Sequence, residues 1–307
     1  MSQNKNINLG YINLFNTHII PVKFNYHAPQ TLEEALNLLN KLKDKARVIA
    51  GGTDLIVDMK LRRKEPEHVV SLNKIRELDY ITVDSLGVKI GAIVKLRKIE
   101  KEKIIRERFP ALYEALKSMA SIQVRNMGTM VGNICNASPA ADTAPPLLIY
   151  NATLTAKSLN NERKIPIEEF FKAPGKTALK EDELVTEIFI PYPPQDSHST
   201  FLKITRVGMD LSKVSIAVLT KFNGSIIEDI RIAFGAVAPT PLRIRRAEEF
   251  LKNKPLTEEN LKIVQEIVAK EIKPITDVRS TEWYRREVAK VLVKDALMKC
   301  LEEKGGR

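Results

Sequence analysis

A long stretch without charge constrains this chain more than any other feature of its sequence. Across residues 126–156 the only charged residue is Asp142, whereas 28% of the 307-residue chain is charged. At that frequency a segment of this length would carry about nine charges. An uncharged segment of glycine, asparagine, proline and apolar residues suits two roles, a crossing through a core or the wall of a ligand site.

Length and composition favour two globular domains. A single core rarely grows beyond about 250 residues, and 44% of the residues are hydrophobic. No apolar run reaches the ~18 residues that a membrane span needs, and the opening MSQNKNINLGYINLF lacks the apolar region of a secretory signal. We therefore expect a cytoplasmic protein without a membrane span.

Charge and cysteine usage exclude several function classes. The net charge is +11, but basic runs such as residues 97–108 mix both signs and lack interleaved aromatic residues, so we expect no nucleic-acid binding. Cys135 and Cys300 are too few for a disulfide framework or a four-thiolate iron–sulfur cluster. The four histidines match no metal-ligand spacing, so no metal site is expected in this chain.

The first half has the pattern of a mixed α/β unit. A helix is predicted over residues 31–42, with Thr31 as N-cap and Glu34 completing a capping box. Further helices are predicted from Asp54 and over residues 96–119, the latter interrupted at Pro110. Turn signals, with Gly87 at a position of positive φ, separate strands predicted at residues 46–50, 80–84, 87–93, 154–158, 163–167 and 183–191.

The second half has the pattern of strands followed by helices. PYPPQDSHST, residues 191–200, is typical of a linker. After it come three predicted strands, the last two joined by a type I′ turn at Asn223-Gly224. The strands are expected within residues 199–207, 213–222 and 225–237, and the helices within 245–252, 257–270 and 280–302.

Two glycine turns are candidate ligand sites. In the first, a strand leads to Gly51-Gly52 and a helix begins at Asp54. Exposed backbone N–H groups there suit a diphosphate, although a plain tight connection fits the same spacing. The turn matches neither GxGxxG nor a P-loop.

The second turn lies within the uncharged segment. Backbone N–H groups around Thr129, Gly132 and Asn133 can bind a polar ligand beside an apolar ring system, with Asp142 as the single carboxylate for a ligand hydroxyl. The alternative is a buried core crossing in which Asp142 caps a short helix. Spacing alone leaves both open.

The motifs resemble those of a known family. AGGTDL, TMVGN and NASPAADTAPP are similar to the FAD-binding medium subunits of molybdenum hydroxylases, the group that includes bacterial carbon monoxide dehydrogenase and the flavin part of xanthine dehydrogenase. IGAIVKLRKIE, FFKAPGKTALKEDELVTEIFIP and ITDVRSTEWYRREVA extend the resemblance over most of the chain.

This resemblance implies a mixed α/β, two-part FAD-binding domain of the vanillyl-alcohol oxidase (PCMH) type, followed by a smaller α+β domain with a three-stranded antiparallel sheet and helices. The expected division is an N-terminal extension (1–18), an FAD-binding domain (19–192) and a C-terminal domain of the carbon monoxide dehydrogenase flavoprotein type (198–303).

The resemblance also implies the site residues. Both glycine turns would donate backbone hydrogen bonds to the FAD diphosphate, Asp142 matches a carboxylate that contacts the sugar-alcohol chain, and Val185 and Lys203 match positions near the isoalloxazine. No catalytic residue is nominated. The candidate cofactor-binding residues are Ala50, Gly51, Gly52, Thr53, Asp54, Leu55, Thr129, Gly132, Asn133, Asp142, Val185 and Lys203.

Three positions depart from or qualify the family pattern. Val131 stands where the family often has a glycine. Thr53-Asp54 stands where some relatives have His-Ser, and because no histidine lies in this turn, the FAD is expected to be noncovalent. Cys135 falls near the flavin by position, although a small buried apolar role fits it as well.

The implied function is electron transfer in a multi-subunit oxidoreductase. A large subunit would oxidise the substrate at a molybdenum cofactor, a small subunit would pass electrons through [2Fe-2S] clusters, and FAD would deliver them to NAD or oxygen. We expect a heterotrimer or a dimer of heterotrimers. The alternatives are a stand-alone FAD-dependent oxidoreductase and a noncatalytic nucleotide-binding or assembly module. Residues 283–286 either dock a partner or anchor the C-terminal domain.

Overall fold

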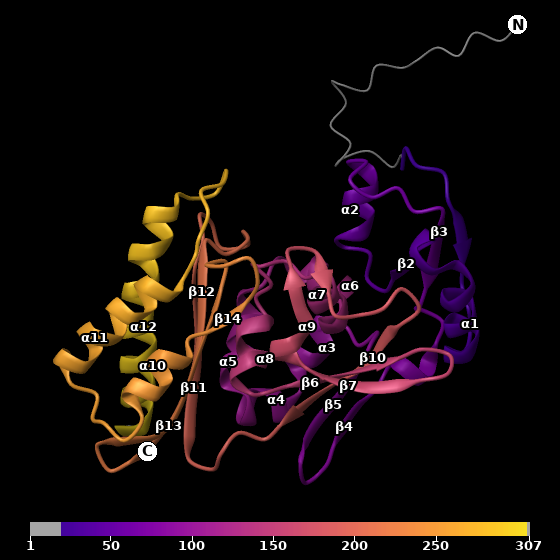
Figure 1. Ribbon diagram of the computed structural model, residues 1–307. Coiled ribbons are helices and arrows are strands. Elements are labelled where there is room, and N and C mark those ends of the chain that lie inside the picture. The colour runs from indigo at the N-terminus through magenta and orange to yellow at the C-terminus, as the bar shows by residue number, and fades with distance from the viewer. Residues whose placement is uncertain (1–19, 306–307) are drawn as a thin grey trace, which may run out of the picture.

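Two hydrophobic cores organise the molecule, which the computed structural model describes over residues 20–305 (Figure 1). The first core contains most buried side chains between Ala35 and Ile190, and the second runs from Val214 to Cys300. The N-terminal extension expected at residues 1–18 lies outside the described residues.

A small parallel sheet opens the fold. In spatial order its strands are β1 (Asn25–His27), β3 (His68–Ser71) and β2 (Ala46–Ile49), and its helices are α1 (Leu32–Leu42) and α2 (Leu55–Lys60). Thr31 caps α1 as predicted, because its Oγ1 accepts a hydrogen bond from the Glu34 N–H at 3.2 Å. The Glu34 carboxylate accepts from the Gln30 N–H at 2.8 Å, so the reciprocal bond lies one residue earlier than a capping box places it.

The second sheet is antiparallel and contains both hairpins predicted in the first half. In spatial order its strands are β4 (Ile81–Val83), β5 (Gly87–Gly91), β10 (Leu184–Pro191), β6 (Thr153–Lys157) and β7 (Glu162–Pro166). Gly87 does not have a positive φ, contrary to the prediction. Glycine is needed there for another reason, since a Cβ atom would lie 2.2 Å from the Ile190 carbonyl oxygen of the neighbouring strand.

Short helices fill the space beside this sheet. The helical pattern predicted over residues 96–119 is three helices, because the chain is extended at Glu102 as well as broken before Pro110. These helices and the small hairpin that follows them are α3 (Leu96–Lys101), α4 (Lys103–Arg108), α5 (Pro110–Ser118), α6 (Ile122–Met127), α7 (Met130–Cys135), α8 (Ala144–Ile149), α9 (Ile167–Phe170), β8 (Phe171–Ala173) and β9 (Lys176–Thr177).

The last third forms an antiparallel sheet covered by helices. Its elements are β11 (Ser197–Ile204), β12 (Val214–Asn223), β13 (Ile226–Gly235), β14 (Leu242–Arg243), α10 (Arg245–Leu251), α11 (Glu258–Glu271) and α12 (Glu282–Gly305). The sheet has four strands rather than the expected three, because two residues after β13 pair back onto it.

The predicted β12–β13 hairpin is present, but its turn differs from the prediction. Asn223 pairs with Ile226, so Gly224 and Ser225 form the loop, and only Gly224 has a positive φ. A type I′ turn needs positive φ at both central residues, so this turn is not of that type.

The β11–β14 sheet is the layer that joins the two cores. In β12, Val214, Ile216 and Val218 belong to the second core, whereas Ala217 and Leu219 belong to the first. Successive side chains of a strand point to opposite faces, so one face meets α10 and α12 and the other meets α5 and α8 (Figure 1). Helix α8, from the uncharged segment, is therefore buried between the two parts.

Candidate functional site

One cavity brings the two glycine turns together. Its volume is about 750 Å³, within the range of roughly 300–1,000 Å³ that is usual for small-molecule pockets. Gly52 and Gly132 both line it, although they are far apart in the sequence. The predicted site residues along its wall are Ala50, Gly51, Gly52, Thr53, Asp54, Leu55, Thr129, Gly132, Asn133 and Val185.

The first turn is pressed against the second. A Cβ atom on Gly51 would lie 2.3 Å from the Met127 carbonyl oxygen and 2.7 Å from the Gly128 Cα, so only glycine fits. Gly52 has a φ of +72°, which glycine adopts without strain. Within residues 20–305 the N–H groups of Gly52, Thr53 and Asp54 find no backbone acceptor. These donors remain available to an anionic ligand.

Side chains fix the second turn. Thr129 caps α7, accepting a hydrogen bond from the Gly132 N–H at 3.0 Å. The Asn133 side-chain oxygen accepts from the Thr143 hydroxyl at 2.7 Å. The Asn136 amide donates to the Asp54 carboxylate of the first turn at 3.1 Å, so a hydrogen bond spans the two turns.

Asp142 and Lys203 do not line the cavity but form a buried ion pair with each other. Lys203 Nζ donates to Asp142 Oδ2 at 2.8 Å, and the Ser212 hydroxyl donates to Oδ1 at 2.6 Å. Burial raises the pKa of Asp142, while the Lys203 ammonium and the two hydrogen bonds act to lower it. The interpretation of Asp142 as a helix cap is wrong, because Thr143 occupies the N-cap position of α8.

Val185 lies on β10 at the cavity wall, and the loop before it contributes residues that sequence reasoning did not nominate. This loop follows the β8–β9 hairpin and contributes Leu179 and Lys180, while Lys176 of β9 and Leu184 of β10 line the cavity on either side of it. Glu183 holds the loop in place through two bonds of 2.8 Å from the Arg163 guanidinium. A signal existed, since the loop falls within FFKAPGKTALKEDELVTEIFIP, one of the motifs that carry the family resemblance.

Two further residues of the uncharged segment lie at the cavity. Val131, at the position where the family often has glycine, is 6% exposed and packs in the first core. Cys135 is half-buried on the cavity wall, and burial raises the pKa of its thiol to about 12. The thiol is therefore neutral at physiological pH and a poor nucleophile.

The uncharged segment combines both roles that its composition allows. Its first part forms the cavity wall at α7, and its second part, from Ala140 to Tyr150, is buried without interruption. Pro139 accepts a hydrogen bond from the Ala236 N–H at 2.7 Å, so the segment also contacts the end of β13 in the β11–β14 sheet. Charged side chains would have no water there, which explains their absence.

Among residues 20–305 there is no group of three or more His, Cys, Asp or Glu side chains that could hold a metal ion. Of the helices in that range, none combines the length and the apolar composition needed to cross a membrane.

Two family models together match nearly all of the described residues. Residues 22–193 match the FAD binding domain in molybdopterin dehydrogenase. Residues 199–300 match the C-terminal domain of the CO dehydrogenase flavoprotein.

Full-length relatives are similar along most of the chain. The glyceraldehyde dehydrogenase medium chain of Sulfolobus acidocaldarius is 36% identical over 277 residues, covering 90% of this chain and 98% of its own length. The xanthine dehydrogenase FAD-binding subunit of Escherichia coli is 32% identical over 285 residues, covering 92% and 97%.

Solved structures agree with these similarities. A chain of the carbon monoxide dehydrogenase from Hydrogenophaga pseudoflava, in a form that lacks the Mo-pyranopterin moiety, superposes with a TM-score of 0.90 at 33% identity, covering 92% of this chain and 99% of that one. A chain of quinoline 2-oxidoreductase from Pseudomonas putida 86 superposes with a TM-score of 0.86 at 26% identity, covering 92% and 98%.

Proposed function

This chain belongs to the family of FAD-binding domains in molybdopterin dehydrogenases, and we propose that it is the flavin-bearing electron-transfer subunit of a molybdenum hydroxylase. The observation that carries the proposal is the single cavity lined by both glycine turns. In this proposal residues 19–192 are the FAD-binding domain and residues 198–303 are the C-terminal domain.

The residues of the cavity suit a noncovalent FAD. The free N–H groups of Gly52, Thr53 and Asp54 would hold the diphosphate from one side. The Thr129–Asn133 turn would line its other side, with the Gly132 and Asn133 N–H groups already bonded to Thr129. On the family resemblance alone we also assign Asp142 to the sugar-alcohol chain and Lys203 to the isoalloxazine, although neither side chain lines the cavity. Among residues 20–305 no histidine lines the cavity, and the Cys135 thiol is kept neutral, so no described side chain there favours a covalent bond.

When bound, FAD supplies a carrier that accepts electrons singly and releases them in pairs. The chain itself would bind and orient this carrier and shield one side of it from water. We assign no general acid or base to the chain, because the electron acceptor rather than a bound organic substrate is expected at this site.

The proposed partners are a large chain with a molybdenum cofactor and a small chain with [2Fe-2S] clusters, in a heterotrimer or its dimer. The relatives support a multi-chain enzyme, since they are named as a medium chain and as an FAD-binding subunit. The proposed external acceptors are NAD and oxygen.

Equilibrium binding of FAD to the full chain tests the proposal. We expect the purified chain to bind one FAD and to show the visible absorption of an oxidised flavin. Gly51→Ala places a Cβ 2.3 Å from a carbonyl oxygen, and this overlap should push the two turns apart and weaken FAD binding at least about tenfold, or ~1.4 kcal/mol.

Gly224→Ala is the matched control, because Gly224 lies in the β12–β13 loop outside the cavity wall. Nothing lies within 4 Å of its added Cβ, although its φ of +55° imposes strain comparable to that of any αL glycine. FAD binding should survive this change. If the unmodified chain binds no FAD, or Gly51→Ala binds it normally, the proposal fails.

Two alternative functions can be distinguished by flavin binding and by the chains that copurify with this one. A stand-alone FAD-dependent oxidoreductase would reduce its flavin with an organic substrate in the absence of other chains. A nucleotide-binding or assembly module would bind no flavin. The proposed subunit binds flavin and copurifies with chains that contain molybdenum and iron–sulfur centres.

A further inference from the structure

Exposed apolar side chains gather at one part of the surface. Fifteen large hydrophobic residues among residues 20–305 are exposed, and ten of them come from only three segments. Single exposed apolar residues are normal, but such a concentration marks an interaction surface. The ten residues are Ile122, Val124, Met127, Val207, Met209, Leu211, Ile275, Val278, Trp283 and Tyr284.

Seven of these residues form what we call the C-terminal rim: Val207, Met209, Leu211, Ile275, Val278, Trp283 and Tyr284. The β11–β12 connection lies against the beginning of α12, because Lys213 Nζ sits 5.3 Å from the centre of the Tyr284 ring. Arg285 is buried and donates to the carbonyls of Lys213 and Ala236 at 3.1 and 2.8 Å. Both expectations for residues 283–286 therefore have a structural basis, since Arg285 anchors the helix while Trp283 is 70% exposed.

The other three residues, Ile122, Val124 and Met127, form what we call the α6 rim. Arg125, the single charged residue of α6, is turned inward and its Nε donates to Glu100 at 2.9 Å. The exposed face of α6 is therefore uncharged. Val124 and Leu211 both line the cavity, so the two rims border the same opening.

We propose that the two rims together are the docking surface for the iron–sulfur chain of the complex, an inference that rests on the proposed function. Exposed Trp, Tyr and Met at the centre of a patch are typical of protein interfaces, where they contribute most of the binding energy. Because the rims lie at the cavity opening, we infer that the partner is the electron-donating chain, since that chain has to reach the cofactor held inside.

Charge around the C-terminal rim indicates what the partner's surface carries. The two segments that form this rim contain more cations than anions, in a chain whose net charge is +11. An acidic border on the partner complements this excess and speeds association at low salt. The charged residues of residues 205–213 and 273–286 are Arg206, Asp210, Lys213, Lys273, Asp277, Arg279, Glu282, Arg285 and Arg286.

Two matched variants of the full chain test the surface. Met209 is 66% exposed at the C-terminal rim, and Leu86 is 70% exposed on the β4–β5 hairpin away from it. Met209→Asp should weaken binding of the iron–sulfur chain, isolated from the native complex, at least about tenfold. Leu86→Asp should leave it unchanged. Both variants should bind FAD like the unmodified chain, which shows that they are folded.

The single tryptophan gives a second readout. Trp283 is the only tryptophan of this chain, so fluorotryptophan incorporated here reports on the C-terminal rim by ¹⁹F NMR even beside a partner with its own tryptophans. We expect its resonance to shift and its solvent isotope effect to fall when the iron–sulfur chain is added.

Three outcomes would overturn the inference while leaving the proposed function intact. In the first, Met209→Asp binds the iron–sulfur chain as well as Leu86→Asp does. In the second, the Trp283 resonance responds only to the molybdenum-cofactor chain. In the third, sedimentation shows that Met209→Asp disrupts a dimer of this chain. Absence of FAD binding would instead be a failure of the proposed function itself.

Discussion

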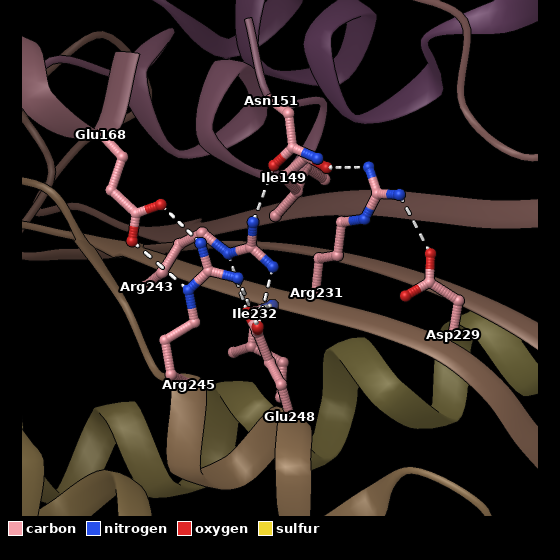
Figure 2. Close-up of polar contacts among 9 residues, drawn as sticks. All are labelled: Ile149, Asn151, Glu168, Asp229, Arg231, Ile232, Arg243, Arg245 and Glu248. Carbon is pink, nitrogen blue, oxygen red and sulfur yellow. Dashed lines mark hydrogen bonds and ion pairs between the residues drawn. The ribbon is translucent and has the colours of Figure 1, made fainter. Parts of the chain in front are cut away.

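Two buried ion pairs lie where the C-terminal domain meets the FAD-binding domain, and they differ in how completely their hydrogen-bonding groups are used. Arg243 donates to both Glu248 oxygens at 2.9 and 2.7 Å, and Glu248 also accepts from the Ile232 N–H at 2.8 Å (Figure 2). A third bond, at 2.8 Å, joins Arg243 to the side-chain oxygen of Asn151 across the domain boundary.

The second ion pair, Lys203 with Asp142, leaves more of its hydrogen-bonding groups unused. The described residues give the Lys203 ammonium one hydrogen-bond acceptor, Asp142, whereas an ammonium has three donors. A network in which every group is hydrogen-bonded, such as the Arg243 cluster, fixes the position of its members. A pair with unused donors, such as Lys203 with Asp142, keeps those donors for a ligand. The Arg243 cluster therefore holds the two domains in place, whereas the Lys203 ammonium keeps donors that a ligand could use, as the proposed function requires.

The largest effect should follow from opening the closed cluster. Glu248→Ala leaves the Arg243 guanidinium buried, with its side chain 3% exposed, and an arginine cannot lose its proton to relieve this. We expect a loss of about 3–5 kcal/mol in the free energy of unfolding, measured by urea denaturation. The double variant Arg243→Met with Glu248→Leu is the control and should lose far less, because it leaves no buried charge.

A smaller loss of stability is expected at the open pair. Asp142→Asn leaves Lys203 without its ion-pair partner, but a lysine can lose its proton where an arginine cannot. We expect a loss of about 2–3 kcal/mol in the free energy of unfolding, together with weaker FAD binding. Asp142→Asn with normal FAD affinity would contradict the functional half of the comparison.

A third cluster, formed by Asp277 with Arg279 and Arg285, should lose its stabilising effect at acid pH. Desolvation raises the pKa of Asp277, but hydrogen bonds from Arg279 and Arg285 outweigh it and lower that pKa to about 2. Because the folded-state pKa lies below the ordinary 3.8, the stabilisation is complete above pH ~4 and is lost as the pH falls toward ~2, in total about 2 kcal/mol. Asp277→Asn should remove this pH dependence from thermal unfolding curves.

The smallest effect should come from the one bond by which Arg243 crosses the domain boundary, to Asn151. Asn151 has a φ of +53°, so Asn151→Gly removes the bond to Arg243 without adding backbone strain. Since Asn151 is exposed, water can replace its oxygen, and we expect a loss of only about 1 kcal/mol. A loss as large as that of Glu248→Ala would show that the contact between the domains, and not the burial of Arg243, carries the stability of the cluster.

Local patterns in the sequence were reliable where the structure depends on neighbouring residues. The Thr31 cap, the hairpins at residues 81–91 and 153–166, and the strand–helix order of the C-terminal domain were all predicted. The predictions failed where the local structure depends on residues far away in the sequence. Gly87 is glycine because β10 approaches it, α3 and α4 separate at Glu102, and β14, the fourth strand of the β11–β14 sheet, forms only because β13 is beside it.

The candidate site was likewise predicted only in part from the sequence. Ten of its twelve predicted residues line one cavity, but Asp142 and Lys203 are paired with each other, and the loop around Lys180 joins the cavity through the β8–β9 hairpin. No spacing rule could assign these partners, because they lie far apart in the sequence.

The amino-acid order alone determined the family, the two glycine turns and the charge-free segment, because each depends on residue type over a short distance. Folding decided that Gly51 contacts Gly128, that the segment both lines a cavity and crosses a core, and that exposed apolar residues border the opening. Contacts between residues far apart in the chain follow from how whole elements pack, and packing is a property of the three-dimensional arrangement.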